Sequence, residues 1–209
     1  MNTTENKRCA YCGSGGPFTN EHVFPNFLYK KYPQHNEGFN RKAGKYLESI
    51  PMVKDVCKEC NNRSLSKLDA YAKIFYETNK CDGGFTTGSQ IHVQYDPDML
   101  FRFILKVTYN GLRGSPYPVQ SVLKDAVPYI LNGSDRPKRL YIFLEILTDY
   151  KIQETDRKHL LDEVKGNDTI PSSWWRLGNL LQFDSRFLER FLELDAFFFS
   201  VFLYHDWYT

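Results

Sequence analysis

The chain has 209 residues, which is enough for one large domain or two small ones with a sizeable hydrophobic core. Apolar residues make up 42% of it and charged residues 25%, which excludes a disordered chain and a fibrous repeat. The net charge is +2, but residues 1–80 hold 13 basic and 8 acidic groups, so positive charge gathers there. We therefore expect a globular protein whose N-terminal part meets any polyanionic partner.

The residues from Met1 to Arg8 contain neither an apolar core nor a small-residue cleavage site. We therefore expect no secretory signal and a cytoplasmic location. The apolar run Asp195–Tyr204 is typical of a buried strand or an interface and is too short to span a bilayer, so we expect no membrane partner. Five cysteines, four of them in two Cys-x-x-Cys pairs, favour metal binding in a reducing compartment over a disulfide framework.

In the N-terminal part, the sequence predicts strands, a loop and a helix. Residues 9–25 predict two short strands around a glycine-rich turn, the second ending at Pro25. Residues 33–46 are polar and basic and predict an exposed loop. A helix is expected from about Ser64 to Thr78, because apolar residues recur there at helical spacing. These apolar residues are Leu65, Leu68, Ala72, Phe75 and Tyr76.

The polar, glycine-rich segment Cys81–Ser89 predicts a junction, so we expect one domain over 1–80 and a second over 90–209. Asp96 is suited to cap a helix that has Pro97 at its first position and stops near Gly111.

Further along the second part, Arg139–Leu147 and Leu194–Tyr204 predict strands, and Ser185–Leu192 predicts a short helix. The predicted fold class is therefore α+β, with a mixed C-terminal domain.

The four paired cysteines, Cys9, Cys12, Cys57 and Cys60, indicate the most specific site in the chain. Two Cys-x-x-Cys pairs supply four thiolates, which close a tetrahedral zinc site with no open position. We therefore expect a structural Zn²⁺ that stabilises the fold and leaves the chemistry to another group. The alternative, a pair of redox-active dithiols, lacks the βαβ pattern that usually accompanies such a motif.

Between the two cysteine pairs lies Glu21-His22-Val-Phe-Pro25, and Asn61 and Asn62 directly follow the second pair. This arrangement resembles the HNH, or ββα-metal, endonucleases, and in particular their four-cysteine branch of endonuclease VII-like nucleases. The resemblance covers roughly residues 9–75. It implies an N-terminal zinc-stapled ββα unit in which His22 is the general base and Glu21 and Asn61 ligate a catalytic metal.

The chemistry of these side chains agrees with that implication. A carboxylate and a carboxamide oxygen form a hard donor pair that suits Mg²⁺ or Mn²⁺ better than zinc. A histidine with an ordinary pKa of ~6.5 offers a neutral imidazole near pH 7 that can accept a proton from water. A lone histidine is more often a packed residue, so the hypothesis for His22 depends on the surrounding Glu21, Asn61 and cysteines.

Two positions depart from the commoner pattern of that family. Asn61 stands where many relatives have a histidine, and an amide oxygen binds metal less firmly than an imidazole. Met52 stands where the family commonly has a central asparagine that orients the base. Asn40, Asn62 or a backbone carbonyl is then needed to hold the ring of His22.

Four basic residues are candidate contacts for nucleic acid. Arg63 and Lys67 lie four residues apart on the predicted helix, where they form either a phosphate clamp or a solvated basic stripe. Arg41 and Lys42 belong to the predicted basic loop. Asp69 is a candidate supporting residue, as is Asn62.

Together these features predict a metal-dependent endonuclease, with DNA as the expected substrate and RNA as the alternative. The resemblance associates such nucleases with bacterial defence by analogy alone. We expect the C-terminal part to select the substrate, to form a homodimer or to bind a partner. Two alternatives are a non-catalytic zinc-binding module for nucleic acid or protein, and an interaction protein that works through the aromatic C-terminus.

Overall fold

The structure is a computed structural model. The described residues are 7–31, 37–40, 45–48, 50–113, 120–151, 153–154, 169–170, 177–179 and 187–204. The chain forms two compact units, Met1–Phe75 with Tyr95–Arg139, and Tyr76–Gln94 with Leu140–Thr209. This division differs from the linear one expected at 1–80 and 90–209, because three helices after the junction group with the N-terminal part. The first unit mixes helices and strands, and the regular elements of the described part of the second unit are strands besides the end of α2, so the chain as a whole has the expected α+β class.

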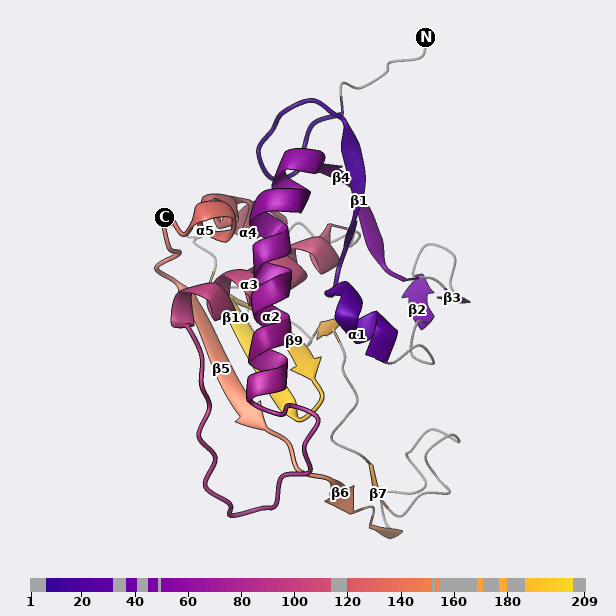
Figure 1. Ribbon diagram of the computed structural model, residues 1–209, viewed down its shortest axis with the longest axis vertical. Helices are drawn as coiled ribbons and strands as arrows, with labels where there is room; N and C mark the ends of the chain where they lie inside the picture. The colour runs from indigo at the N-terminus through magenta and orange to yellow at the C-terminus, as the bar shows by residue number, and fades with distance from the viewer. Residues whose placement is uncertain are drawn as a thin grey trace. The chain divides into compact units, whose positions relative to one another are not determined.

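The first unit contains two two-stranded antiparallel sheets, β1-β4 and β2-β3, and most of the described helices (Figure 1). Its elements in chain order are β1 (Phe18–His22), α1 (Asn26–Lys31), β2 (Glu37–Asn40), β3 (Lys45–Glu48), β4 (Met52–Cys57), η2 (Cys60–Leu65), α2 (Ser66–Thr78), α3 (Pro97–Leu112), α4 (Gln120–Asp125) and α5 (Val127–Asn132). Helix α2 continues three residues into the second unit.

Strand β1 pairs with β4, not with a second strand inside residues 9–25 as the sequence suggested. The register places His22 opposite Met52 and Phe18 opposite Cys57. The long-range pairing carries the second cysteine pair to the first, which a local hairpin within residues 9–25 would not do. The expected loop over 33–46 is also corrected in part, because β2 and β3 form an antiparallel pair there.

The helix predicted from about Ser64 to Thr78 ends where expected and begins earlier. Helical backbone starts at Lys58, passes through the π-helical turn η2 and continues as α2. The earlier start follows from the cysteine pair, since the backbone N–H of Cys60 lies 3.4 Å from the sulfur of Cys57. All five residues of the predicted apolar face are buried, at 3% exposure or less: Leu65, Leu68, Ala72, Phe75 and Tyr76.

Helix α3 confirms the sequence reading closely. The side chain of Asp96 accepts hydrogen bonds from the backbone N–H groups of Asp98 and Met99, at 2.9 and 3.1 Å, and Pro97 is the first helical residue. The apolar residues Leu100, Phe103, Ile104 and Val107, which recur at helical spacing, are buried, and Phe103 and Ile104 are fully inaccessible. The carboxylate cap satisfies N–H groups that would otherwise lack a partner, so the start of the helix is fixed locally.

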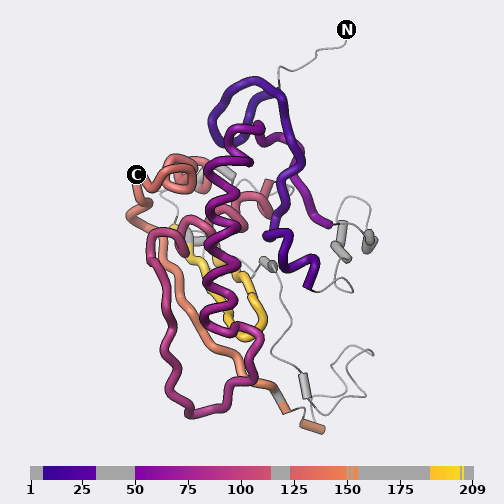
Figure 2. Tube along the Cα trace, viewed as in Figure 1, coloured from indigo at the N-terminus to yellow at the C-terminus, as the bar shows by residue number. Residues whose placement is uncertain are grey.

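The second unit contains an antiparallel sheet with strand order β5-β10-β9-β8. Its strands are β5 (Leu140–Ile146), β6 (Tyr150–Lys151), β7 (Thr169–Ile170), β8 (Leu177–Asn179), β9 (Phe187–Leu194) and β10 (Phe197–Tyr204), and β6 pairs with β7. Figure 2 shows the segment that follows α2 as an extended loop, and the backbone carbonyl of Cys81 in it accepts a hydrogen bond from Ala196.

Strand β5 confirms the prediction for Arg139–Leu147 to within one residue at each end. The short helix predicted for Ser185–Leu192 is wrong within the described residues, because β9 occupies Phe187–Leu194. The strand predicted for Leu194–Tyr204 is present as β10 (Phe197–Tyr204). A turn at Asp195 joins it to β9, and the backbone φ of Asp195 is 53°, in the left-handed region.

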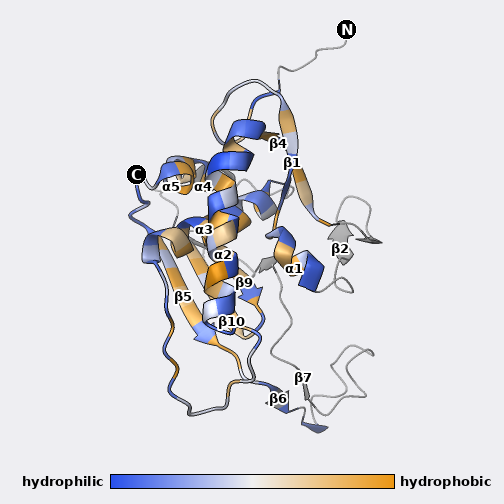
Figure 3. Cartoon of the chain, viewed as in Figure 1, coloured by the Kyte–Doolittle hydropathy of each residue, from blue (hydrophilic) through white to orange (hydrophobic). Residues whose placement is uncertain are grey.

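The four-stranded sheet of the second unit has two different faces. Phe197, Phe199 and Val201 of β10 are buried on one face, and β5 of the same sheet is coloured mainly as hydrophobic in Figure 3. On the other face, Tyr141 and Phe143 of β5 are 52% and 54% exposed. In the part of the chain that the structure describes, no helix is long and apolar enough to cross a membrane.

Candidate functional site

The four paired cysteines converge in the first unit, as the sequence predicts. The sulfur atoms of Cys9, Cys12, Cys57 and Cys60 all lie within 4.8 Å of one another. Those of Cys12 and Cys57 are 3.6 Å apart. Four sulfurs at ~2.3 Å from a zinc ion lie about 3.8 Å from one another, so the cluster has the dimensions of a tetrahedral site. The four thiols could therefore bind a zinc ion.

The hydrogen bonds around this cluster favour the charged form of one thiol. Burial opposes ionisation of Cys12, but hydrogen bonds with Ser14, Cys57 and Cys60 outweigh it and lower its pKa to about 6. Burial and the neighbouring thiols raise the pKa of Cys60. Four adjacent thiols cannot all ionise without a cation to offset their charges, which a divalent metal supplies.

A second cluster lies around Glu21 and His22 at the end of β1. Glu21 is 3% exposed, and its Oε1 lies 2.6 Å from the ammonium nitrogen of Lys106 on α3. The same ammonium group lies 2.8 Å from Oδ1 of Asp69 on α2 and 3.4 Å from the backbone oxygen of His22. Burial raises the pKa of Glu21, and the charge of Lys106 acts against that rise. One lysine therefore joins both candidate carboxylates to the histidine backbone.

The imidazole of His22 is half-buried beside the ring of Tyr29, with 5.8 Å between ring centroids. Burial and the positive charge of Lys106 lower the pKa of His22, while Asp69 acts in the opposite direction. The neutral imidazole therefore prevails near pH 7, which is the form that accepts a proton. Within the described residues, no hydrogen bond holds the ring of His22, and Met52 faces it across the sheet.

Asn61, at the start of η2, is hydrogen-bonded to the same strand, β1. Its amide nitrogen donates to the hydroxyl of Thr19 at 2.8 Å and to the backbone oxygen of Asn20 at 3.2 Å. The amide oxygen is thus the atom left to bind a metal. Because Thr19 and Asn20 directly precede Glu21, these bonds attach the start of the helix to the strand that carries the two proposed catalytic side chains.

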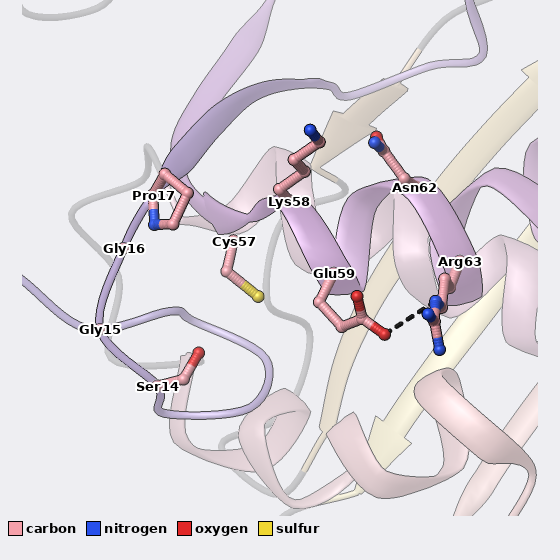
Figure 4. A pocket seen from close by; sticks show the side chains of 9 residues that line it. All are labelled: Ser14, Gly15, Gly16, Pro17, Cys57, Lys58, Glu59, Asn62 and Arg63. Carbon is pink, nitrogen blue, oxygen red and sulfur yellow. Dashed lines mark ion pairs between the residues drawn. The ribbon is translucent and has the colours of Figure 1, made fainter.

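Asn62 and Arg63 belong to a different region from Glu21 and His22. They line an open pocket of about 460 Å³ beside the cysteine cluster, together with the loop from Ser14 to Pro17 (Figure 4). Arg63 forms an exposed ion pair with Glu59 at 2.9 Å. Neither Asn62 nor Arg63 contacts His22, so the prediction that Asn62 orients the base finds no support in this geometry.

The other predicted nucleic-acid contacts have a mixed outcome. Lys67 is exposed on α2, as a phosphate contact requires. Arg41 and Lys42 lie outside the described residues, and so does the side chain of Asn40. The basic loop therefore stays a prediction.

Two residues of this site were missed by sequence analysis, and both come from α3. Lys106 is fully buried, and the amide nitrogen of Asn110 lies 3.4 Å from Oε1 of Glu21 and 3.2 Å from the backbone oxygen of His22. Asn110 also accepts a hydrogen bond from Tyr11 at 2.7 Å. Their spacing of four residues in a helix rich in apolar residues was the available sign that this helix binds polar partners.

Comparison with known proteins returns no matching family model, no similar curated protein and no similar solved structure. The resemblance to the ββα-metal endonucleases therefore depends on the motif residues alone.

The donor set is compatible with a hard divalent cation. Both hydrogen bonds that Glu21 receives end on Oε1, so Oε2 is the carboxylate oxygen left for a metal. The amide oxygen of Asn61 is the matching neutral ligand. Glu21, Asp69 and Lys106 together carry one net negative charge when both carboxyl groups are ionised, which favours a cation.

Proposed function

We propose that this protein is a zinc-stabilised, metal-dependent endonuclease that hydrolyses phosphodiester bonds, with DNA as its preferred substrate. The observation that supports this proposal most is the half-buried, neutral His22, which directly follows Glu21 on β1, the strand to which Asn61 is hydrogen-bonded. Strand β1 carries Glu21 and His22, and the helical turn η2, which follows the antiparallel partner β4, carries Asn61. The ββα resemblance implies two paired strands followed by a helix, and in this chain α1, β2 and β3 lie between the two strands.

In the proposed reaction, His22 acts as the general base. A water molecule loses a proton to the imidazole and attacks the phosphorus, and the bond to the leaving sugar oxygen breaks. General-base catalysis of this kind contributes about 10²–10⁴-fold to the rate. Burial keeps the imidazole unprotonated near pH 7, and the contact with Tyr29 limits its rotation.

Glu21 and Asn61 would hold the Mg²⁺ or Mn²⁺ ion. When bound, such an ion stabilises negative charge on the phosphoryl and leaving oxygens. The protein itself fixes both ligands, since Lys106 and Asn110 hold Glu21 Oε1 and Thr19 holds the amide nitrogen of Asn61. The side chains are thereby positioned before the cation arrives, which limits the cost of ordering them.

The alternative is a zinc-binding module that binds nucleic acid or protein without cleaving it. It would keep the cysteine cluster and the fold while Glu21, His22 and Asn61 serve only to connect β1 with the helices. The two functions differ in their dependence on a divalent ion other than zinc. Substrate selection, dimerisation and partner binding by the C-terminal unit stay predictions.

Neighbouring asparagines provide a matched test of the metal assignment. Asn61→Ala should raise the Mn²⁺ concentration needed for half-maximal plasmid nicking by roughly tenfold or more, because it removes one ligand. Asn62→Ala should leave that concentration unchanged, since Asn62 faces the pocket beside the cysteines. Nicking is measured across a Mn²⁺ titration. Equal behaviour of the two variants would remove Asn61 from the metal site.

The residue opposite His22 provides a test in which activity should rise. Directly opposed residues of an antiparallel pair have Cβ atoms about 5 Å apart, so Met52→Asn should bring an amide to the imidazole. We expect up to ~10-fold faster nicking, because an oriented ring accepts the proton more often. Met52→Leu is the control and should match the wild type. If the asparagine variant equals the leucine variant in rate, orientation of His22 does not limit the reaction.

A further inference from the structure

The four-stranded sheet of the second unit presents aromatic side chains on one face. Residues opposite each other in an antiparallel pair share a face, so the register of β5, β10 and β9 determines which side chains gather there. These three strands lie side by side in Figure 1. We use the name aromatic face for the six residues Tyr141, Phe143, Phe191, Phe198, Phe202 and Tyr204.

The rings of the aromatic face pack against one another in pairs. Their centroids are 5.4 to 5.7 Å apart, within the range of favourable ring contacts. Each pair joins two strands: Tyr141 with Tyr204, Phe143 with Phe202, and Phe191 with Phe198. Tyr141, Phe143 and Tyr204 are nevertheless exposed. Exposed aromatic surface of this kind, with its rings already ordered, is typical of a binding site.

Two carboxylates lie on the same face of the sheet. Glu145 of β5 and Glu189 of β9 stand opposite members of the aromatic face on β10. Burial and the negative charge of Glu145 raise the pKa of Glu189, so the two carboxylates are close enough to repel each other. Within these three described strands the one basic residue is Arg190, which is buried on the other face opposite Val201. The aromatic face is therefore negatively charged.

The charge of the whole second unit has the same sign. Its residues, 76–94 and 140–209, hold 8 basic and 14 acidic groups, a net charge of −6, whereas the first unit holds 19 basic and 11 acidic groups. Aromatic rings could also stack on nucleic-acid bases, but the phosphates would then approach Glu145 and Glu189. Symmetric pairing of two copies through this face would likewise bring like charges together. The charge therefore favours a basic partner.

We propose that the aromatic face binds an arginine-rich segment of a partner protein. A guanidinium group is planar, stacks on aromatic rings and forms paired hydrogen bonds with a carboxylate, which an ammonium group cannot do. Tyr141 and Phe143 supply exposed rings, and Glu145 and Glu189 supply the carboxylates. A guanidinium group beside both carboxylates would also offset their mutual repulsion. This binding function is separate from the hydrolysis proposed for the first unit.

The experiment measures the fluorescence anisotropy of a labelled synthetic peptide of alternating arginine and glycine, titrated with the zinc-loaded full-length chain. The wild type should bind it saturably and more weakly as salt is added, whereas a peptide of alternating glutamate and glycine should not bind. Glu145→Gln and Glu189→Gln should each weaken binding by about two- to fivefold, and Glu145→Lys by roughly tenfold or more. Asp125→Asn is the control, because Asp125 is exposed on α4 of the first unit, and its affinity should equal that of the wild type.

A matched pair of aromatic residues tests the contribution of the rings. Phe143 and Tyr95 are 54% and 53% exposed, but Tyr95 belongs to the first unit. Phe143→Ala should weaken binding of the arginine peptide by about two- to fivefold, because a guanidinium group loses its stacking partner. Tyr95→Ala should bind as the wild type does. Thermal melting confirms that each variant is folded, and Glu145→Lys decides the question should Phe143→Ala not fold.

Weaker binding by the carboxylate and ring variants, with both controls unchanged, supports the inference. No saturable binding by the wild type, or equal affinity of the wild type and Glu145→Lys, overturns it. Single-stranded oligothymidylate that binds the wild type but not Phe143→Ala would make the face a nucleic-acid site instead. Self-association in sedimentation velocity that Glu145→Lys abolishes would identify the partner as a second copy of the chain, and each of these two results would also overturn the inference.

Discussion

Replacing His22 with alanine should reduce plasmid nicking by about 10²–10⁴-fold, because the proposed general base is lost and no other neutral imidazole faces the site among the described residues. Zinc content, melting temperature and DNA binding should stay close to the wild type, since His22 ligates neither proposed metal. The measurement is the initial rate of nicking at saturating Mn²⁺. It isolates proton transfer from folding and from substrate binding.

The control for this variant is His92→Ala, because His92 is exposed in the loop that follows α2. It should nick at the wild-type rate. A wild-type rate in His22→Ala as well would reject the active-site assignment and favour the binding-module alternative.

Replacing Cys57 with serine should unfold the first unit. Each cysteine supplies one of four ligands, and structural zinc sites contribute apparent binding energies of about 10–16 kcal/mol in small peptides. That exceeds or equals the total stability of a typical domain, so the loss of one ligand should not be tolerated. Zinc content by atomic absorption and the thermal melting curve measure the effect.

The fifth cysteine supplies the matched control. Cys81 is fully buried in the second unit and does not belong to the cysteine cluster. Cys81→Ala should therefore keep a full complement of zinc. A Cys57→Ser variant with unchanged zinc content and melting would mean that the cluster holds no structural metal.

The local features of the fold were predictable where short-range chemistry decides them. The carboxylate of Asp96 caps α3 because two backbone N–H groups lie within its reach, and the spacing of Leu65, Leu68 and Ala72 determines the buried face of η2 and α2. Both inferences need only neighbouring residues. The cysteine cluster joins residues 45 positions apart and was predictable for another reason, since four thiols in two Cys-x-x-Cys pairs can share one metal ion.

Features that depend on distant partners were not predictable. Lys106 contacts the backbone of His22, which lies 84 residues away in the sequence. The sequence of the helix does not indicate which distant residue Lys106 contacts. Strand β9 illustrates the same limit, because its apolar residues Phe187, Leu188, Phe191 and Leu192 also fit helical spacing. Pairing with β10 across the turn at Asp195 stabilises the strand conformation of this segment over the helical one.

We propose that Glu21, His22 and Asn61 together hydrolyse phosphodiester bonds with the help of a divalent ion. The most direct measurement follows supercoiled plasmid incubated with zinc-loaded wild-type protein, with and without Mn²⁺ or Mg²⁺, beside His22→Ala. We predict nicked product only when wild-type protein and the added ion are both present. Equal nicking by His22→Ala, or no nicking by the wild type with either ion, would contradict the claim.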